Sequence, residues 1–149
     1  MWPPKKILCP TDFSEGSQAA ISQATELARQ FGAMIYLLHV IPIQTSLPTD
    51  PISSFNMAEA TDILQEQAKR NLQDSAEKLQ HAGLTTRAIV LMGEAASAIV
   101  ETAEREQVDL IVIATYGKTG WRRLAFGSVT EKVVRLATCP VLTIRGAPQ

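Results

Sequence analysis

Residues 109–130 read DLIVIATYGKTGWRRLAFGSVT, and the interpretation of the whole chain starts from this stretch. Residues 109–115 are almost wholly apolar and rich in branched side chains, which is typical of a parallel strand covered on both faces. Gly117 and Gly127 follow with nine residues between them, and a helical pattern begins directly after Gly127. The stretch therefore predicts a strand, a glycine-containing loop and a helix start in succession.

This order of elements suits the binding of a phosphate group. Glycine lacks a Cβ, so backbone N–H groups can approach an anion closely, and a helix N-terminus presents unpaired donors with a partial positive charge. The hydroxyls of Ser128 and Thr130 are candidate further donors. The spacing matches neither the GxxxxGK loop nor GxGxxG. A turn at Gly117 and an ordinary Gly-Ser helix start explain the same residues equally well, because serine is a favoured cap residue.

The rest of the chain alternates short apolar runs with amphipathic segments. The runs predict strands at residues 6–9, 34–41, 85–92, 109–115 and 141–144. Apolar side chains three and four residues apart predict helices at 14–31, from 57 to about 81, at 96–103 and at 129–137. Prolines and small polar residues predict a surface loop from 42 to 56. Five strands alternating with four helices indicate an α/β fold with a parallel sheet.

Length and composition narrow the class of protein. The 149 residues fit one domain, 1–149, and 46% hydrophobic with 19% charged residues is ordinary for a globular protein. The net charge is −1, and the local group of Lys118, Arg122 and Arg123 is too small for a nucleic-acid interface, so we expect no nucleic-acid partner. Apolar runs are too short for a membrane span or a signal peptide, so we expect no membrane partner and a cytoplasmic location.

The cysteines and histidines are few and scattered. Two cysteines and two histidines in no ligand spacing make a zinc site improbable. Cys9 ends an apolar run and Cys139 precedes a proline, so we expect both to be small buried apolar residues.

A ligand site is expected where polar residues follow two strands. Ligands of open α/β sheets bind beyond the carboxyl ends of the strands, at the point where the strand order reverses. Pro10, Thr11 and Asp12 follow the first strand, and residues 115–118 follow the fourth. If these strands are neighbours, a nucleotide can lie across both, with its anion at the Gly127 helix start and its ribose or base near Asp12.

Several of these residues have a simpler explanation. Asp12 and Glu15 form a pattern like a capping box, so a structural cap alone would account for Asp12. His39 is expected to be a hydrogen-bonded sheet residue rather than a catalyst. Lys118 either reaches phosphates or is a solvated loop lysine. Trp121 and its two neighbouring arginines are either a flap over the nucleotide or a patch that contacts a partner.

Four segments together resemble the universal stress protein family. They are PTDFSE at 10–15, LHV at 38–40, DLIVIATYGKTG at 109–120 and FGSVTEKVVRLATCPVLTIR at 126–145. The resemblance covers the whole chain in order. It implies a doubly wound, Rossmann-like, five-stranded parallel sheet with strand order 3-2-1-4-5. It also implies a homodimer formed by pairing of the last strand, residues 141–144.

The ATP-binding branch of that family carries the motif G-x2-G-x9-G followed by Ser or Thr. Gly117, Gly127 and Ser128 fall on its last three elements, but Ala114 stands at the first glycine. The Cβ of Ala114 causes little backbone strain if the backbone is extended at this position, and it would cause strain if φ were positive.

The resemblance also implies a role for each part of the site. Pro10, Thr11 and Asp12 would line the adenine and ribose side, and the backbone of Val40 would contact the base. The ribose and first phosphates would follow Ala114, Thr115, Gly117 and Lys118, and the terminal phosphates would be held by Gly127, Ser128, Val129 and Thr130.

Three functions remain open at this point. The first is an ATP-binding stress or signalling module, with ATP carrying Mg²⁺, that acts as a homodimer. The second is a slow Mg-dependent ATPase or an adenylate-handling transferase, for which Asp12 is the only carboxylate that we can place near the site. The third is a nucleotide-free dimeric interaction protein, a reading that Ala114 and the Trp121 patch keep open.

Overall fold

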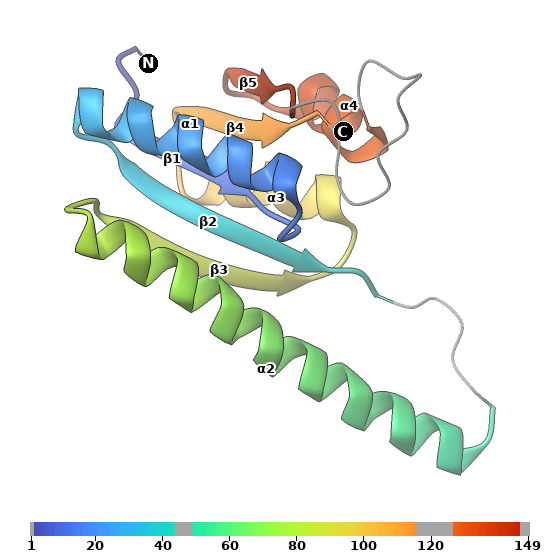
Figure 1. Cartoon of the computed structure of the whole chain (residues 1–149). Helices are drawn as coiled ribbons and strands as arrows, with labels where there is room; N and C mark the ends of the chain where they lie inside the picture. The colour runs from blue at the N-terminus through green and yellow to red at the C-terminus, as the bar shows by residue number, and fades with distance from the viewer. Residues whose placement is uncertain (1, 44–48, 116–126, 147–149) are drawn as a thin grey trace.

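The computed structural model describes residues 2–43, 49–115 and 127–146, which form a twisted parallel sheet between two layers of helices (Figure 1). The strands are β1 (Lys6–Pro10), β2 (Met34–Ile41), β3 (Thr86–Met92), β4 (Leu110–Ala114) and β5 (Val141–Ile144). The helices are α1 (Glu15–Phe31), α2 (Pro51–His81), α3 (Ala95–Arg105) and α4 (Ser128–Leu136). The strand order is β3-β2-β1-β4-β5, which confirms the predicted doubly wound fold.

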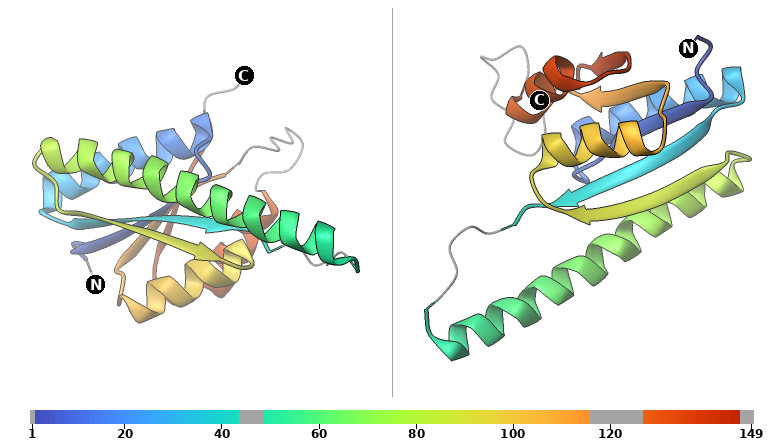
Figure 2. Two further views of the ribbon diagram at one scale, coloured as in Figure 1. Left: turned by 90° about the horizontal axis from the view of Figure 1, so that it is seen from below. Right: turned by 180° about the vertical axis from the view of Figure 1, so that it is seen from behind.

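The period of two along each strand builds a core on both faces of the sheet. Ile7 and Cys9 of β1 belong to the cluster that includes side chains of α1 and α2. Leu8, between them, belongs to the cluster that includes side chains of α3 and α4. All three are fully buried, and Figure 2 shows the two helix pairs on opposite sides of the sheet. Strands buried on both faces explain the nearly continuous apolar runs of the sequence.

Local signals set the ends of α1. The Ser14 side chain accepts a hydrogen bond from the Ser17 backbone N–H at 3.2 Å and caps the helix. Gly32 closes the helix with φ +64°, a left-handed conformation that glycine adopts without steric cost. The predicted helix 14–31 is thus confirmed, with Ser14 as its cap residue.

The predicted loop from 42 to 56 is wrong over its last six residues, because α2 begins at Pro51. The Asp50 carboxylate accepts a hydrogen bond from the Ser53 N–H at 2.8 Å, and Pro51 stands at the first helical position. Proline is well tolerated there, since that N–H has no partner within the helix. The prolines of this segment predict a loop, but the Asp50-Pro51 pair in fact begins a helix.

The two edges of the sheet are β3 and β5. Leu142 of β5 is 38% exposed. No helix within the described residues is long and apolar enough to cross a membrane.

Candidate functional site

A cavity of about 620 Å³ opens at the carboxyl ends of the central strands. The central strand β1 pairs with β2 on one side and β4 on the other, so the strand order reverses at this point. The predicted residues that line the cavity are Pro10, Thr11, Asp12, Val40, Ala114, Gly127, Ser128, Val129 and Thr130. The two polar segments of the sequence therefore meet, as the switch-point rule predicts.

The loop after β1 is fixed by its own short polar side chains. Asp12 Oδ1 accepts a hydrogen bond from the Ser14 N–H at 3.0 Å, and Thr11 Oγ1 accepts one from the Phe13 N–H at 3.1 Å. Phe13 has φ +64°, which is rare for a bulky residue, and it is partly buried against the core. Asp12 is thus not the helix cap, which is Ser14, but part of a tight turn that holds its carboxyl group in the cavity wall.

His39 is a hydrogen-bonded sheet residue, as predicted. Its Nδ1 lies 2.8 Å from the Thr11 carbonyl oxygen, and because a carbonyl only accepts, Nδ1 carries the proton. Its ring lies against Phe13 with ring centroids 4.6 Å apart. His39 therefore ties the end of β2 to the loop after β1 and lines the cavity from there.

The start of α4 is drawn tightly against the end of β4. The Gly127 N–H donates to the Thr115 carbonyl at 2.7 Å, and the Thr130 hydroxyl donates to the Ala114 carbonyl at 2.7 Å. A Cβ on Gly127 would stand 3.1 Å from the Thr115 oxygen, a tight contact that would require this carbonyl or the start of α4 to shift slightly. The Thr130 hydroxyl thus fixes α4 and is not available as a donor to phosphate, contrary to the expectation from the sequence.

Ala114 lies in the extended backbone of β4, paired with Ile144 of β5. It is absent from the non-glycine residues of positive φ among the described part of the chain. An extended residue accepts a Cβ without strain, so alanine fits at the first glycine position of the motif.

The N-terminus of α4 differs from those of the other three described helices. α1, α2 and α3 each have a side chain that accepts from their first turn, namely Ser14, Asp50 and Glu94. The cap residue of α4 is Gly127, which has no side chain to offer. Among the described residues, none accepts from the N–H groups of residues 128–130, which line the cavity. This helix end is therefore open to an anion.

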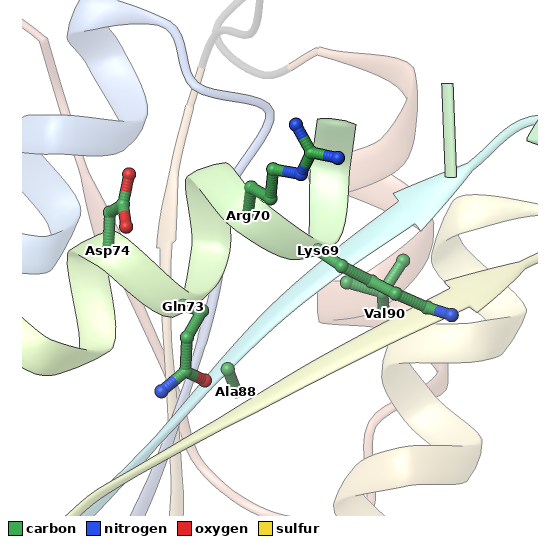
Figure 3. A pocket seen from close by; sticks show the side chains of 6 residues that line it. All are labelled: Lys69, Arg70, Gln73, Asp74, Ala88 and Val90. Atoms are coloured by element: carbon green, nitrogen blue, oxygen red, sulfur yellow. The ribbon is translucent and has the colours of Figure 1, made fainter. Parts of the chain in front are cut away.

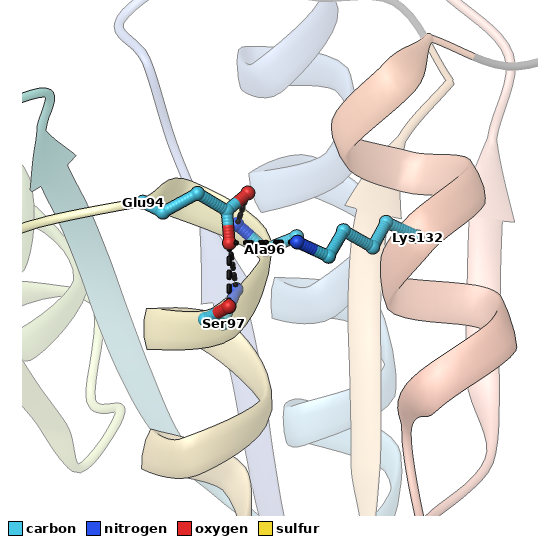
Figure 4. Close-up of polar contacts among 4 residues, drawn as sticks. All are labelled: Glu94, Ala96, Ser97 and Lys132. Atoms are coloured by element: carbon cyan, nitrogen blue, oxygen red, sulfur yellow. Dashed lines mark hydrogen bonds and ion pairs between the residues drawn. The ribbon is translucent and has the colours of Figure 1, made fainter.

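The neighbouring helix start already holds a carboxylate (Figure 4). Glu94 accepts from the N–H groups of Ala96 at 3.2 Å and Ser97 at 2.9 Å, from the Ser97 hydroxyl, and from Lys132 Nζ at 3.2 Å. The hydrogen bond from the Ser97 hydroxyl has the largest effect, and together these bonds lower the pKa of Glu94 to about 2. The same contacts join α3 to α4, and they leave α4 as the open helix end of the cavity.

The other predicted site residues divide into two groups. Thr115 is buried at the end of β4 and supplies the carbonyl that receives Gly127. Gly117, Lys118, and the patch at Trp121 with its two arginines lie outside the described residues.

Part of the cavity wall is formed by residues that no sequence motif predicted. Leu64 and Ala68 come from α2, and Gly93, Ala95 and Ile99 come from the turn after β3 and from α3. The spacing of apolar residues along α2 and α3 predicts only that they pack in the core. No local motif marks any of them as cavity residues.

A second hollow of about 630 Å³ lies between α2 and β3, lined by Lys69, Arg70, Gln73, Asp74, Ala88 and Val90 (Figure 3). Its polar groups do not converge. Lys69 extends over β3, whereas Arg70 and Asp74 point to the other side of the helix. Lys69 Nζ also lies 3.7 Å from the Glu66 carboxylate on the same helix. The cavity at the switch point is therefore the better candidate for a ligand site.

The cysteines take no part in the site. Cys9 is fully buried, as predicted, and burial raises its pKa to about 12, so it stays a thiol at neutral pH. Cys139 is partly buried against the core of α3 and α4, and desolvation raises its pKa as well. No group of three or more potential metal-ligating side chains occurs within the described ranges.

The doubly wound sheet, with a cavity and an open helix end at its switch point, places this protein among the α/β folds whose ligands bind beyond the carboxyl ends of the strands. The sequence model of the universal stress protein family matches residues 3–145. The chain therefore belongs to the universal stress protein family.

Individual relatives match this chain over most of their length. Universal stress protein MJ0531 of Methanocaldococcus jannaschii is 34% identical over 141 residues, covering 95% of this chain and 82% of that protein. The solved structure of MJ0577, from the same organism, has a TM-score of 0.83 and 32% identity and covers 97% of this chain and 98% of that one. More distant neighbours that share the fold include a universal stress protein in complex with cAMP, at 21% identity and a TM-score of 0.72. Another is a universal stress protein family protein from Arabidopsis thaliana with AMP bound, at 23% identity and a TM-score of 0.67.

Proposed function

We propose that this protein is an ATP-binding universal stress protein that holds ATP with Mg²⁺ in the switch-point cavity and acts as a nucleotide-responsive homodimer. The observation that carries the proposal is the start of α4, where Gly127 provides no side-chain cap. Residues 128–130 line the cavity, and their N–H groups have no acceptor among the described residues. An anion at a helix N-terminus is stabilised by these donors and by the helix dipole. The terminal phosphates are the part of ATP that this end would hold.

The opposite part of the cavity suits a base and a ribose. Its walls include Ile41, Pro42 and Leu64, which offer apolar surface to a flat ring, and the end of β2 at Val40. Asp12 stands in the wall as a carboxylate, a group that binds ribose hydroxyls or Mg²⁺. A volume of about 620 Å³ falls in the range of small-molecule sites. The AMP and cAMP complexes of family neighbours support an adenine nucleotide as the ligand class.

The extended backbone at Ala114 supports the nucleotide-binding reading over the nucleotide-free one. The main sequence argument for an empty site was that Ala114 replaces the first motif glycine. Since Ala114 is paired within β4, its methyl group causes no backbone strain, and the residue lines the cavity. For the dimer, the edge strand β5 carries Leu142, which is 38% exposed and suited to pairing with a second copy.

The test is a calorimetric titration with ATP and Mg²⁺ of the wild type, the Gly127→Val variant and the matched Gly146→Val variant. A side chain at Gly127 would push α4 away from the Thr115 carbonyl and misplace the N–H groups. Losing one or two charge-assisted hydrogen bonds, at about 1.5–3 kcal/mol each, weakens ATP binding by at least about tenfold. Gly146 lies outside the cavity, so its variant should bind as the wild type does. Equal affinity of all three proteins would place the phosphates elsewhere.

A further inference from the structure

The N-terminal half of α2 has no core to pack on. We call residues 51–67 the α2 arm. None of them is buried, and the buried positions of the helix are Ala68, Leu72 and Ala76. Figures 1 and 2 show the arm extending past the end of the sheet. It spans about 25 Å at 1.5 Å per residue. Most helical stability in proteins comes from packing of a helix face, and the arm buries none of its side chains, so it would gain stability from a partner.

Large apolar side chains are exposed on this arm. Ile52 is 75% exposed, Phe55 is 71% and Ile63 is 61%. They differ from Leu64, which lines the cavity on another side of the helix. Exposed apolar side chains gathered on one element mark an interaction surface.

The charges on the arm have a single sign. Glu59, Asp62 and Glu66 are exposed, and residues 51–67 contain no Lys, Arg or His. Lys69, just beyond the arm, forms an exposed ion pair with Glu66 at 3.7 Å. Residues 52, 55, 59, 62 and 66 follow one another at intervals of three and four, so they form one seam with a period of 3.5. Ile63 borders this seam, next to Glu59 and Glu66 on the helix surface. The seam therefore mixes apolar anchors with carboxylates on one face.

We propose that the α2 arm docks a cationic amphipathic helix of a partner protein. A seam with a period of 3.5 lets a second helix lie along the arm, with apolar contacts at residues 52 and 55 and charge contacts at 59, 62 and 66. Apolar residues of that helix would cover Ile52, Phe55 and Ile63, and its Lys or Arg side chains would meet the carboxylates. Anionic lipid surfaces and nucleic acids are repelled by the same carboxylates. A parallel second copy of the arm would bring like charges together, and an antiparallel one would set carboxylates against Ile52 and Phe55. The inference does not depend on nucleotide binding.

The test uses two synthetic helical peptides with leucines at the same spacing, one with lysines at its polar positions and one with glutamates. Fluorescence anisotropy at low salt measures the binding of each to the full-length protein. The lysine peptide should bind and the glutamate peptide should not. Replacing Ile52, Phe55 and Ile63 together by serine should weaken binding of the lysine peptide at least tenfold.

A charge-reversed variant separates docking from simple loss of the arm's structure. In the Glu59→Lys, Asp62→Lys, Glu66→Lys protein the preference should reverse, so that the glutamate peptide binds. Unchanged helix content by circular dichroism and the same preference at 0.15 M salt would show that the reversal belongs to the folded arm, since attraction between unstructured charges is largely screened there. Glu101→Lys, on an exposed glutamate of α3, is the control and should leave the preference unchanged.

Three outcomes would overturn the proposal. They are equal binding of both peptides, unchanged binding by the serine variant, and no binding of the lysine peptide. Self-association that is lost in the serine variant, seen by sedimentation velocity, would assign the arm to a second copy instead.

Discussion

A negative charge at Ser128 should separate the stability of α4 from its role in binding. Ser128 is the first residue of α4, is exposed and lines the cavity. In the Ser128→Asp variant, a carboxylate near the open N–H groups interacts favourably with the helix dipole. Such an interaction stabilises a helix by about 0.3–1 kcal/mol. The ligand-free protein should therefore be as stable as the wild type or slightly more so.

The same carboxylate should prevent nucleotide binding. At about 5 Å and an effective dielectric constant near 20, a unit negative charge opposes a phosphate charge by about 3 kcal/mol. That corresponds to a loss of more than about a hundredfold in ATP affinity. Ser128→Asn, of nearly the same size but neutral, is the matched control and should lose far less.

Two assays on the three proteins make the comparison. Urea denaturation without ligand gives the stability, and calorimetric titration with ATP and Mg²⁺ gives the affinity. An unchanged affinity of Ser128→Asp, with a folded protein, would show that no phosphate binds at the start of α4.

Three further results are expected. Leu142→Asp should convert a dimer into a monomer in sedimentation velocity, because it places a charge on the edge strand β5; a dimer that persists would refute pairing through β5. Thr130→Val should lower the free energy of unfolding by about 1–3 kcal/mol, because it removes the hydroxyl that donates to the buried Ala114 carbonyl. Urea denaturation measures this change, and an unchanged free energy of unfolding would show that the bond does not stabilise the fold. The folded-state pKa of Glu94, about 2 against an ordinary 4.5, means that its carboxylate stabilises the fold above pH 4.5 and loses this effect as the pH falls toward 2. The stability difference between wild type and Glu94→Gln should therefore shrink over that interval, and a constant difference would contradict the assigned contacts.

The strands were predicted to within one residue at either end, because their apolar runs are ended by Pro, Gly or polar residues. The run at 34–41, for example, was confirmed as β2. The spacing of apolar residues and the residues that form turns are local properties, so the sequence shows them directly. The strand order is not local, and it came from the resemblance to a family.

The start of α2 could not be predicted in the same way. Asp50 and Pro51 are as typical of a turn as of a helix start, and residues 51–56 carry no core-facing pattern to decide between them. The proposal that the arm is a docking surface rests on the exposure of its side chains, which the sequence alone does not show.

The lining of the cavity was predicted for the two polar segments that are each continuous in the sequence. Asp12 and Gly127 were placed in one crevice, and the cavity confirms this. Two functions of side chains were missed because they depend on distant partners. Thr130 donates to a carbonyl sixteen residues away, and Glu94 fills the α3 start and reaches Lys132 on α4.

The most direct test of nucleotide binding begins with freshly purified wild-type protein. It is denatured, any released nucleotide is identified by chromatography, and refolded, stripped protein is titrated with ATP and Mg²⁺. The account predicts released adenine nucleotide or, at a hundredfold excess of ATP over the dissociation constant, about 2.7 kcal/mol of added stability. Protein that is empty on purification and shows neither heat of binding nor a shift in unfolding would contradict it.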